Sequence, residues 1–512
     1  MQLGIDIGTH AARAAYLDSG GRPQLVQFAA GVTSLPALAR QTMHGLVIGQ
    51  EAARALVGNA ETTIVGCTRL MGRAGEIPAP LLARLPYAVR EIGGEATCNL
   101  LFAEVRASEA FGRIVRALAD AAAQSLGEAI EGVILTVPAG AEDRFRVQAR
   151  TAVEAQGLRV VRLINQPTAA VLALGPGVGK LVAVVSCGGG TTEVSLAERS
   201  PQGVRIRAVA ADPLLGGDDM AWAVAEQLNT RFQHNEGIDV FAVGDSRAAA
   251  QGLWAATKDV LEQLHDAPQA QLVLDHGGGF GRDLAMLVRR REVEHWLQPL
   301  VSRIAVLCRR VLSTAGVRAR DVESVVLIGD ETALPLVRAV IARAFDRDVA
   351  ALHTTDAQAL AAYGAALVGA DGAPSVWDVT PYPLGINCYY AEEELFSPII
   401  RANTPIPTPP VGSQGAHTES YCTRYPDQTN VRLDVLQYRG PLDANPRGVG
   451  RVRPDACEKL GSWEFSGLQP KPGREAPFTV TFAVDQDGIL QLFARETETG
   501  HTLTAQIERG LG

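Results

Sequence analysis

The sequence predicts a two-lobed α/β domain followed by an antiparallel β-sandwich. From residue 1 to about residue 370, short apolar and β-branched runs alternate with longer helical patterns, which is typical of sheets covered by helices. Two strand–turn–strand segments with glycine-rich turns, Leu3–Leu17 and Leu181–Leu196, echo each other and indicate two similar lobes. After Ala370 the composition becomes proline-rich and strand-like, which predicts a new domain.

We place the first domain at residues 1–370, a linker at residues 371–377 and the second domain at residues 378–507. Short alternating runs such as Val431–Leu436 and Phe478–Val484, divided by turns such as Asp487-Gly488, predict the sandwich. These strand patterns end close to residue 507.

The bulk composition limits the classes of partner. The chain has 512 residues, of which 47% are hydrophobic, so it can bury more than one core. Its net charge of −9 argues against nucleic acid and anionic membranes as partners. The N-terminus lacks a signal-peptide pattern and no apolar run approaches the roughly 18 residues of a membrane span, so we expect a cytoplasmic protein. Seven scattered cysteines without a CxxC spacing predict neither disulfides nor a zinc site.

The two echoing turns are candidates for phosphate binding. Glycine reaches positive φ without a steric clash, so backbone N–H groups can approach a polyphosphate there. One such turn alone is usually only a hairpin, but two in equivalent places favour phosphate binding. The turn residues are Gly8, Thr9, His10, Gly188, Gly189, Gly190 and Thr191. Asp6, at the end of the first strand, is placed to hold the waters of a Mg²⁺ ion, although a strand-end aspartate is more often structural.

A third candidate is Gly216-Gly217-Asp218-Asp219, which directly precedes a helical pattern. Backbone amides at a helix N-terminus attract phosphate. The alternative, a helix cap by Asp218 or Asp219, is equally consistent with these residues.

Taken in order, these segments resemble the motifs of the seventy-kilodalton heat-shock (DnaK-type) chaperones. The resemblance covers roughly residues 2–506 and is carried by Gly4–Thr9, Arg69–Arg73, Thr136–Ala139, Ile164–Ala170, Gly188–Thr191, Leu215–Asp219, Ala362–Ala366, Asp378–Pro381, Leu384-Gly385, Asn403–Thr408 and Asp485–Leu490. It implies an actin-like nucleotide-binding domain built from ribonuclease-H-like repeats, and a β-sandwich peptide-binding domain. It also implies ATP or ADP with Mg²⁺ as cofactors, and unfolded or extended polypeptides and co-chaperones as partners.

The resemblance carries further residue roles over to this chain. Gly329 lies in a loop next to the nucleotide, and Pro138, Arg146 and Asp378 pass the nucleotide state to the peptide domain. Two of these have plainer interpretations, because Pro138 can simply end a strand and Arg146 can lie on a helix surface. The implied peptide pocket lies around Tyr421, Val431 and Leu433, and core packing is the alternative for each of them.

The family pattern is broken at the groups that hydrolyse ATP. Where the family has a lysine, a glutamate and an aspartate, this chain has Thr68, Gln166 and Ser186, so only Asp6 remains of the four polar groups. No lysine occurs before Lys180 that could replace the lost one. Phosphoryl transfer depends on positioning and electrostatic stabilisation, so we expect the loss of these charged groups to slow or abolish ATP hydrolysis.

The nucleoside side of the cleft is altered too. The helix that surrounds adenosine in the family carries Lys258, Leu261, Glu262 and His265 at the corresponding positions. In the loop of Gly329, Asp330 and Glu331 bring negative charge towards phosphate, and Ala333 replaces an arginine of the family pattern.

We therefore expect a lid-less, chaperone-like protein that binds extended apolar peptides and hydrolyses ATP very weakly or not at all. Whether it is an enzyme stays open at this point. One alternative is an ATP-dependent chaperone in which His10 or Arg69 replaces the lost cation. Another is a sugar-kinase-like or filament-forming member of the actin superfamily, against which the motifs of the second domain argue.

Overall fold

The structure, a computed structural model, describes residues 1–56, 59–73, 77–242, 246–274, 283–354, 357–370, 372–390, 392–440, 452–471 and 475–506. The chain divides into two compact units, unit 1 with residues 1–140 and 151–375 and unit 2 with residues 141–150 and 376–512. The division after Ser375 lies within the predicted linker 371–377. Residues 371 and 507, at the predicted start of the linker and end of the second domain, lie outside the described residues.

Two sheets of unit 1 share one strand order. In each sheet, with the strands counted in chain order, the first strand pairs antiparallel with the second and parallel with the fourth. The third strand pairs with the second and the fifth pairs with the fourth, so they extend the sheet on its two sides. The strands of the first sheet are β1 (Gln2–Ile7), β2 (Ala11–Leu17), β3 (Pro23–Leu25), β11 (Gly132–Val137) and β12 (Val160–Asn165). Those of the second are β13 (Leu181–Cys187), β14 (Thr192–Ser200), β15 (Gly203–Asp212), β18 (Ser324–Ile328) and β19 (Leu352–His353). The echoing sequence segments are thus the first hairpins of two equivalent sheets, and the predicted mixed α/β character is confirmed.

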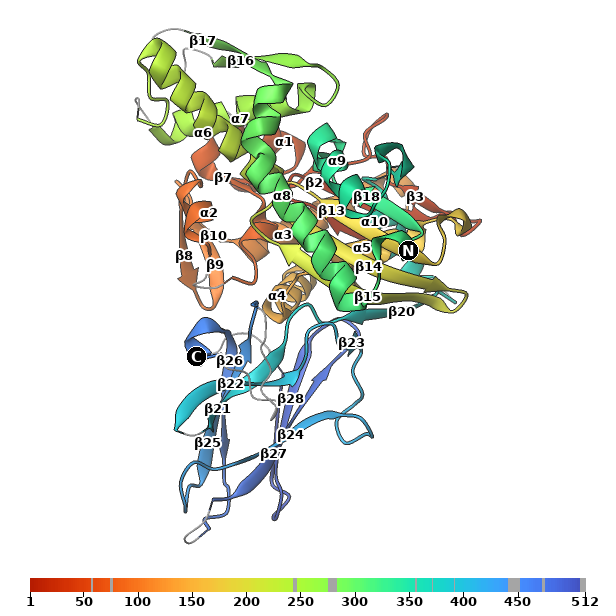
Figure 1. The fold of residues 1–512 in the computed structure, drawn as a ribbon, viewed down its shortest axis with the longest axis vertical. Coiled ribbons are helices and arrows are strands. Elements are labelled where there is room, and N and C mark those ends of the chain that lie inside the picture. The colour runs from red at the N-terminus through yellow and green to blue at the C-terminus, as the bar shows by residue number, and fades with distance from the viewer. Residues whose placement is uncertain are drawn as a thin grey trace. The chain divides into compact units, whose positions relative to one another are not determined.

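Helices cover these sheets. Figure 1 shows α8 (Arg290–Ala315) along the face of β14 and β15, where its apolar side joins the core of this sheet. The other helices are α1 (Gln50–Arg54), α2 (Ala79–Ala83), α3 (Ala107–Leu126), α4 (Asp143–Glu154), α5 (Gln166–Ala173), α6 (Gly217–Glu236), α7 (Ser246–Gln263), α9 (Pro335–Ala344) and α10 (Leu360–Val368). None of the described helices is long and apolar enough to cross a membrane.

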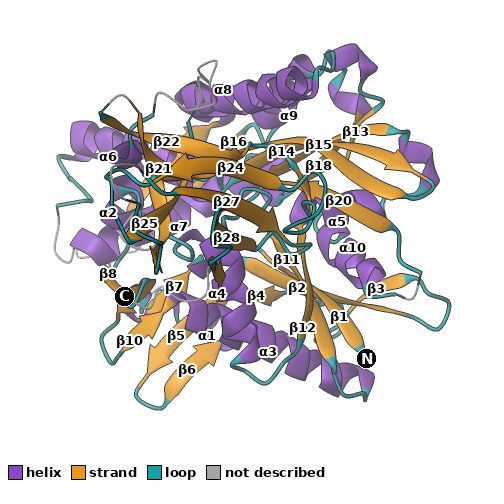
Figure 2. Cartoon of the chain, turned by 90° about the horizontal axis from the view of Figure 1, so that it is seen from below, coloured by secondary structure: helices purple, strands orange, loops and turns teal. Residues whose placement is uncertain are grey.

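Small residues let α10 pack closely against β1 and against α5, beside which it lies in Figure 2. A Cβ added to Gly364 of α10 would lie 1.7 Å from the carbonyl oxygen of Ala169 in α5. A Cβ added to Gly4 of β1 would lie 2.2 Å from the backbone nitrogen of Ala366. The alanine- and glycine-rich motif at residues 362–366 is therefore a packing requirement.

Shorter strands of unit 1 form small sheets beside the two large ones. They are β5 (Leu38–Thr42), β6 (Gly45–Ile48), β7 (Thr63–Val65), β8 (Ala88–Ile92), β9 (Glu95–Asn99), β10 (Glu104–Arg106), β16 (Gln269–Leu274) and β17 (Leu284–Arg289). The two-residue strand β4 (Leu35–Pro36) instead pairs with β2 in the first large sheet.

Unit 2 contains two four-stranded antiparallel sheets that share one hydrophobic core, in which Phe465, Phe478 and Phe482 are fully buried or nearly so. The first sheet has the order β22 (Glu393–Ile400), β21 (Leu384–Tyr390), β25 (Asn430–Gln437) and β26 (Glu458–Ser466). The second has the order β24 (His417–Cys422), β27 (Pro477–Val484), β28 (Leu490–Glu496) and β29 (Thr502–Gln506). A short pair, β20 (Ser375–Val379) and β23 (Pro405–Ile406), joins through Asp378 and Ile406. The strands predicted at 431–436 and 478–484 lie within β25 and β27.

Candidate functional site

The two predicted phosphate turns of unit 1 pack directly against each other. A Cβ added to Gly189 would lie 2.5 Å from Cδ2 of His10, and one added to Gly190 would lie 2.7 Å from Oγ1 of Thr9. In the first turn, the Gly8 N–H donates to the Ala11 carbonyl over 2.9 Å. Glycine is required in the second turn because the side chains of the first turn occupy the space next to it.

The N-terminus of α6 and the loop of Gly329 meet the second turn. The N–H groups of Gly217 and Asp218 donate to the carbonyl oxygens of Gly188 (3.0 Å) and Gly189 (2.8 Å). The Gly216 N–H donates to Oδ2 of Asp219 over 3.1 Å, so Asp219 caps the helix. Gly329 has a φ of 89°, and a Cβ there would lie 2.3 Å from the Cys187 carbonyl oxygen. The structure thus brings the predicted glycine segments together. The first N–H groups of α6 are already hydrogen-bonded to carbonyl oxygens of the second turn.

Charged side chains lie at the junction of the two turns. Nε2 of His10 is 2.6 Å from Oδ1 of Asp218, and Nζ of Lys258 is 3.0 Å from the same His10 nitrogen. Nη1 of Arg69 is 3.6 Å from Oδ2 of Asp218. Burial raises the pKa of the Asp218 carboxyl, but His10, Lys258 and Arg69 outweigh this effect and hold the pKa below its usual value. With Asp219, these residues form what we call the cleft cluster.

Arg69 forms a buried ion pair with Asp219. Its Nη2 lies 3.1 Å and 2.9 Å from the two carboxylate oxygens, and both side chains are less than 8% exposed. Nη1 of Arg84 also reaches Asp219, at 3.1 Å. Thr68, at the position of the family's lysine, precedes Arg69 in the same short helix and is half-buried. Arg69 therefore serves as a buried bridge to α6, which argues against the alternative in which it replaces the lost lysine.

Asp6 is held by two neutral donors. Its Oδ1 accepts hydrogen bonds from Oγ1 of Thr136 (2.5 Å) and Nε2 of Gln166 (2.8 Å). Burial raises the pKa of the Asp6 carboxyl, and the two hydrogen bonds and Arg13 only partly offset this. Gln166 begins α5 and supplies a donor where the family pattern has a carboxylate. Ser186, on β13, is half-buried.

Glu331 lies against the N-terminus of α6. A Cβ on Gly217 would lie 1.5 Å from its Oε1. Burial, reinforced by Asp330 and Asp218, raises the pKa of Glu331 to about 7, against the opposing effect of Lys258. Asp330 is exposed and accepts a hydrogen bond from Gln358 at 2.5 Å. The acidic loop anticipated from the sequence therefore brings one carboxyl to the phosphate turns.

The hydrogen-bond partners of Asp6 are neutral groups. The carboxylate of Asp6 faces an amide and a hydroxyl, and the cationic side chains of the cleft cluster are paired with Asp218 and Asp219. Across the described ranges, no group of three histidine, cysteine, aspartate or glutamate side chains is arranged to hold a metal ion.

The predicted peptide-pocket residues line one groove of unit 2. Tyr421, Val431 and Leu433 lie along it, and the groove has a volume of about 840 Å³. Leu433 is only 1% exposed and belongs to the core, whereas Tyr421 and Val431 pack against that core from the groove. The Tyr421 ring stacks on Phe478 at 5.9 Å between centroids, and its hydroxyl is 2.9 Å from Oγ of Ser397.

Arg146 is buried rather than on a helix surface. Within unit 2, its Nη1 donates to the Asp487 carbonyl over 3.0 Å and its Nε donates to the Ala141 carbonyl over 3.1 Å. Burial lowers the pKa of Arg146, and nearby carboxylates, led by Asp378, counter this. Asp378 is itself buried, and Pro138 follows β11 and is half-buried. The predicted role of these residues in coupling stays a prediction.

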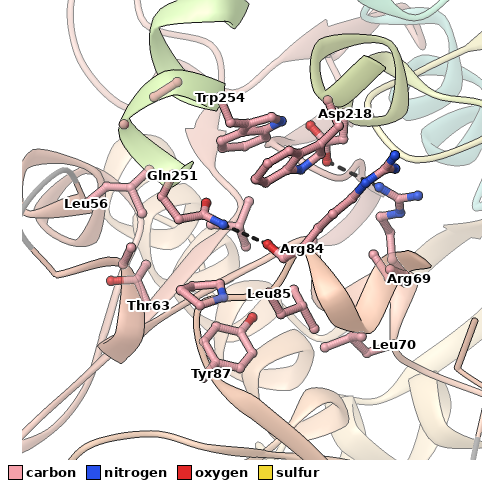
Figure 3. Close-up of a pocket in the computed structure, with 18 residues that line it drawn as sticks. Leu56, Thr63, Arg69, Leu70, Arg84, Leu85, Tyr87, Asp218, Gln251 and Trp254 are labelled. Atoms are coloured by element: carbon pink, nitrogen blue, oxygen red, sulfur yellow. Dashed lines mark hydrogen bonds and ion pairs between the residues drawn. The ribbon is translucent and has the colours of Figure 1, made fainter. Parts of the chain in front are cut away.

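Sequence reasoning missed Arg84, Trp222 and Trp254, which surround the cleft cluster. Figure 3 shows Arg84 and Trp254 in the lining of one pocket beside this cluster. Arg84 lies over the ring of Trp222 at 5.9 Å, and Trp222 and Trp254 stack at 6.2 Å between centroids. No local motif marks these three residues. The usable signal in the sequence was that each is a large polar or aromatic residue in a stretch rich in alanine. Lys258 was assigned to the nucleoside, and the structure places it against His10.

Comparison with known proteins agrees with this arrangement of segments. The family model described as "Hsp70 protein" matches residues 2–512. The chain is 29% identical to the "Chaperone protein dnaK1" of Nostoc sp., over 99% of this chain and 72% of that protein. It is 31% identical to the "Chaperone protein HscA homolog" of Acidithiobacillus ferrooxidans, over 98% of this chain and 76% of that protein. This chain therefore belongs to the Hsp70 family.

Proposed function

We propose that this protein is a chaperone that binds extended, apolar peptide segments in the groove of unit 2, and that its actin-like nucleotide-binding domain binds nucleotide weakly and does not hydrolyse ATP. The single observation that carries the first part is the groove itself, with apolar side chains at its base next to the edge strand β24. The second part rests on the cleft cluster and on the neutral partners of Asp6.

An edge strand can accept an extended peptide. β24 pairs with β27 and lies at the end of its sheet, so its outer backbone groups are available for a peptide strand to add to it. Residues 419–423 of this strand and the following turn line the groove. Backbone pairing supplies affinity without regard to sequence, and the pocket around Tyr421 and Val431 selects an apolar side chain.

The rim of the groove favours peptides with basic flanks. Its lining includes the acidic residues Glu392, Glu394, Glu419, Asp434 and Glu475. The basic lining residues are Arg424 and Arg432, of which Arg432 is paired with Asp434 at 2.9 Å and Arg424 lies over the Tyr389 ring at 3.6 Å. The surplus of negative charge attracts a cationic peptide and repels an acidic one.

The test is fluorescence anisotropy with a labelled peptide that carries a central leucine between arginines. We expect saturable binding to the full chain, and at least a tenfold loss in Val431→Glu, since a carboxylate cannot be buried without a partner. Val306→Glu on α8, where Val306 is 54% exposed, is the matched control and should bind as the unaltered protein does. Equal binding by Val431→Glu, or equal affinity for a peptide with acidic flanks, would contradict the proposal.

The lack of hydrolysis follows from what occupies the space between the turns. The ring of His10 contacts Gly189, and Arg69 and Lys258 already neutralise Asp218 and Asp219. A triphosphate would have to displace these pairs, and Glu331 would oppose it above a pH of about 7, where this carboxyl ionises. We therefore expect nucleotide to bind weakly, and the hydrogen-bond partners that the structure describes for Asp6 are the neutral side chains of Thr136 and Gln166.

Calorimetric titration with Mg-ADP and single-turnover hydrolysis of Mg-ATP test this second part. We expect a Kd above about 10 μM and no hydrolysis above the rate in buffer. His10→Ala removes the ring between the turns and should tighten ADP binding without creating turnover, whereas His295→Ala on the exposed side of α8 should change neither. Brisk turnover by the unaltered protein would refute this part and leave the peptide site untouched.

A further inference from the structure

One arginine side chain reaches across the groove of unit 2. Arg424 follows β24 of the second sheet, and its guanidinium carbon lies 3.6 Å from the ring centroid of Tyr389, near the end of β21 in the first sheet. The ring centroid of Tyr425 lies 5.2 Å from the same carbon atom. At such distances a guanidinium and an aromatic ring attract each other through a cation–π contact. Arg424 therefore covers aromatic surface that belongs to the groove.

The two tyrosine side chains remain largely exposed beside Arg424. Tyr389 is 47% exposed and Tyr425 is 57% exposed. In the described part of unit 2 they are the only large hydrophobic side chains with so much exposure, and both line the groove. Exposed apolar surface that gathers in one place is typical of a binding site.

The guanidinium of Arg424 is held loosely. Its carboxylate partner is Glu392 at 3.8 Å, and the two side chains are 36% and 94% exposed. Water screens an ion pair at such a position, and a cation–π contact at an exposed site changes a binding constant by only about two- to fivefold. Another cation can therefore compete with Arg424 for the ring of Tyr389.

The turn that carries Arg424 is fixed by other hydrogen bonds. Oε1 of Gln428 accepts hydrogen bonds from the N–H groups of Arg424 (3.1 Å) and Tyr425 (3.3 Å). Thr423 is 1% exposed, and its Oγ1 donates to the Tyr425 carbonyl over 3.1 Å and accepts from the Ala476 N–H over 2.8 Å. The guanidinium takes no part in these bonds, so the Arg424 side chain can move aside while the turn stays in place.

The charge of the groove favours a cation in the place of Arg424. The charged side chains of the lining and their ion-pair partners comprise five acidic and three basic groups, which leaves a surplus of negative charge. The acidic groups are Glu392, Glu394, Glu419, Asp434 and Glu475, and the basic ones are Arg424, Arg432 and Lys459. Arg432 and Lys459 both pair with Asp434, at 2.9 Å and 2.8 Å. When Arg424 moves aside, a guanidinium of the ligand can take over its pairing with Glu392.

Given that peptides bind in this groove, as proposed above, we propose that Arg424 occupies a subsite for an arginine side chain of the peptide until the peptide displaces it. The subsite consists of the rings of Tyr389 and Tyr425 and the carboxylate of Glu392. One ring face holds one guanidinium, so Arg424 competes with the arginine of the peptide. This competition lowers the affinity for arginine-containing peptides and leaves the affinity for neutral peptides unchanged.

Fluorescence anisotropy with two labelled peptides tests this subsite in the full chain. One peptide carries a central leucine between arginines, and the other has glutamines in place of the arginines. Arg424→Ala removes the competing guanidinium, so the Kd of the arginine peptide should fall about two- to fivefold while that of the glutamine peptide stays the same. Arg432→Ala is the matched control, because Arg432 carries the same charge in the same groove but pairs with Asp434. It should change either Kd by less than about twofold.

A double variant tests whether the gain depends on the ring. Tyr389→Leu keeps an apolar side chain and removes the ring face on which a guanidinium stacks. In the variant that combines Tyr389→Leu with Arg424→Ala, the arginine peptide should bind no more tightly than it binds to the unaltered protein.

Three results would overturn the subsite. Weaker binding of both peptides by Arg424→Ala would make this side chain a strap that holds any bound peptide. An unchanged Kd of the arginine peptide in Arg424→Ala would show that Arg424 does not compete with it. A gain that survives Tyr389→Leu, or that Arg432→Ala matches, would assign the effect to charge alone.

The peptide function and the subsite can fail separately. If the unaltered protein binds neither peptide, or if Val431→Glu binds them equally well, both are wrong. If the unaltered protein binds and Val431→Glu does not, the groove is the peptide site, and the variants at Arg424 and Tyr389 decide on the subsite alone. Circular dichroism shows whether each variant is folded, and Arg424→Gln, which keeps a long uncharged side chain, serves in place of Arg424→Ala if that variant does not fold.

Discussion

The buried bridge between Arg69 and Asp219 should contribute strongly to the stability of unit 1. Arg69→Met removes the guanidinium but keeps an apolar stem of similar length. Asp219, which is 6% exposed, then keeps Arg84 and the Gly216 amide as partners. Removing one partner of a buried ion pair typically costs 3–5 kcal/mol, and the remaining contacts place this case near the lower end, at about 3 kcal/mol.

Urea unfolding followed by tryptophan fluorescence measures this loss, because Trp222 and Trp254 lie beside the bridge. With a slope of about 3 kcal/mol per molar urea, the midpoint of unit 1 should fall by about 1 M. Arg116→Met is the control. Arg116 pairs with Asp120 on the exposed side of α3, where the two side chains are 43% and 57% exposed, and such a pair is worth about 0.3–0.5 kcal/mol.

A double-mutant cycle separates the pair from its surroundings. In Arg69→Met with Asp219→Asn, neither charge is left buried alone, so the double variant should lose less stability than the sum of the two single losses. If Arg69→Met and Arg116→Met shift the midpoint equally, or if the two losses simply add, the assignment of a buried bridge between the two parts of unit 1 is wrong.

Three further outcomes are expected. Glu331 has a pKa of about 7 in the folded state against 4.5 for the free side chain, so the folded state holds this proton more tightly than the unfolded state. Stability therefore falls as the pH rises through this window. Glu331→Gln should lessen the fall in the unfolding midpoint between about pH 5 and pH 8, and equal falls in the variant and the unaltered protein would refute this. Gln166→Glu places a second carboxyl next to Asp6 and should lower the free energy of unfolding more at about pH 8 than at about pH 5. Single-turnover hydrolysis of ATP by this variant should stay at background, and a gain in turnover would count against a non-hydrolysing site. Tyr421→Phe removes the hydrogen bond to Ser397 and should cost unit 2 about 1 kcal/mol in urea unfolding while peptide binding persists, and loss of peptide binding would assign the hydroxyl to the ligand.

The cleft cluster changes how the departures from the family pattern are understood. Thr68, Gln166 and Ser186 are not isolated losses, because Gln166 donates to Asp6 and the cationic neighbours of the turns are bound to Asp218 and Asp219. The N–H groups of Gly8 and Gly188, the first amides of α6 and the cationic side chains of the cleft cluster thus have partners within the protein.

The sequence alone determined the features that depend on local geometry. Glycine is needed where a strand turns within a few residues or where another backbone comes close, so Gly8, Gly189 and Gly190 could be recognised without a structure. Strands alternate with a period of two, so β25 and β27 could be located from their apolar pattern. The missing lysine, glutamate and aspartate were visible because the surrounding motifs keep their order.

Only the tertiary structure decided which charges pair. Arg69 and Asp219 are 150 positions apart, and His10 and Lys258 are 248 positions apart. An ion pair over such a distance leaves no local pattern, because its energy depends on burial and on a fit of a few tenths of an ångström.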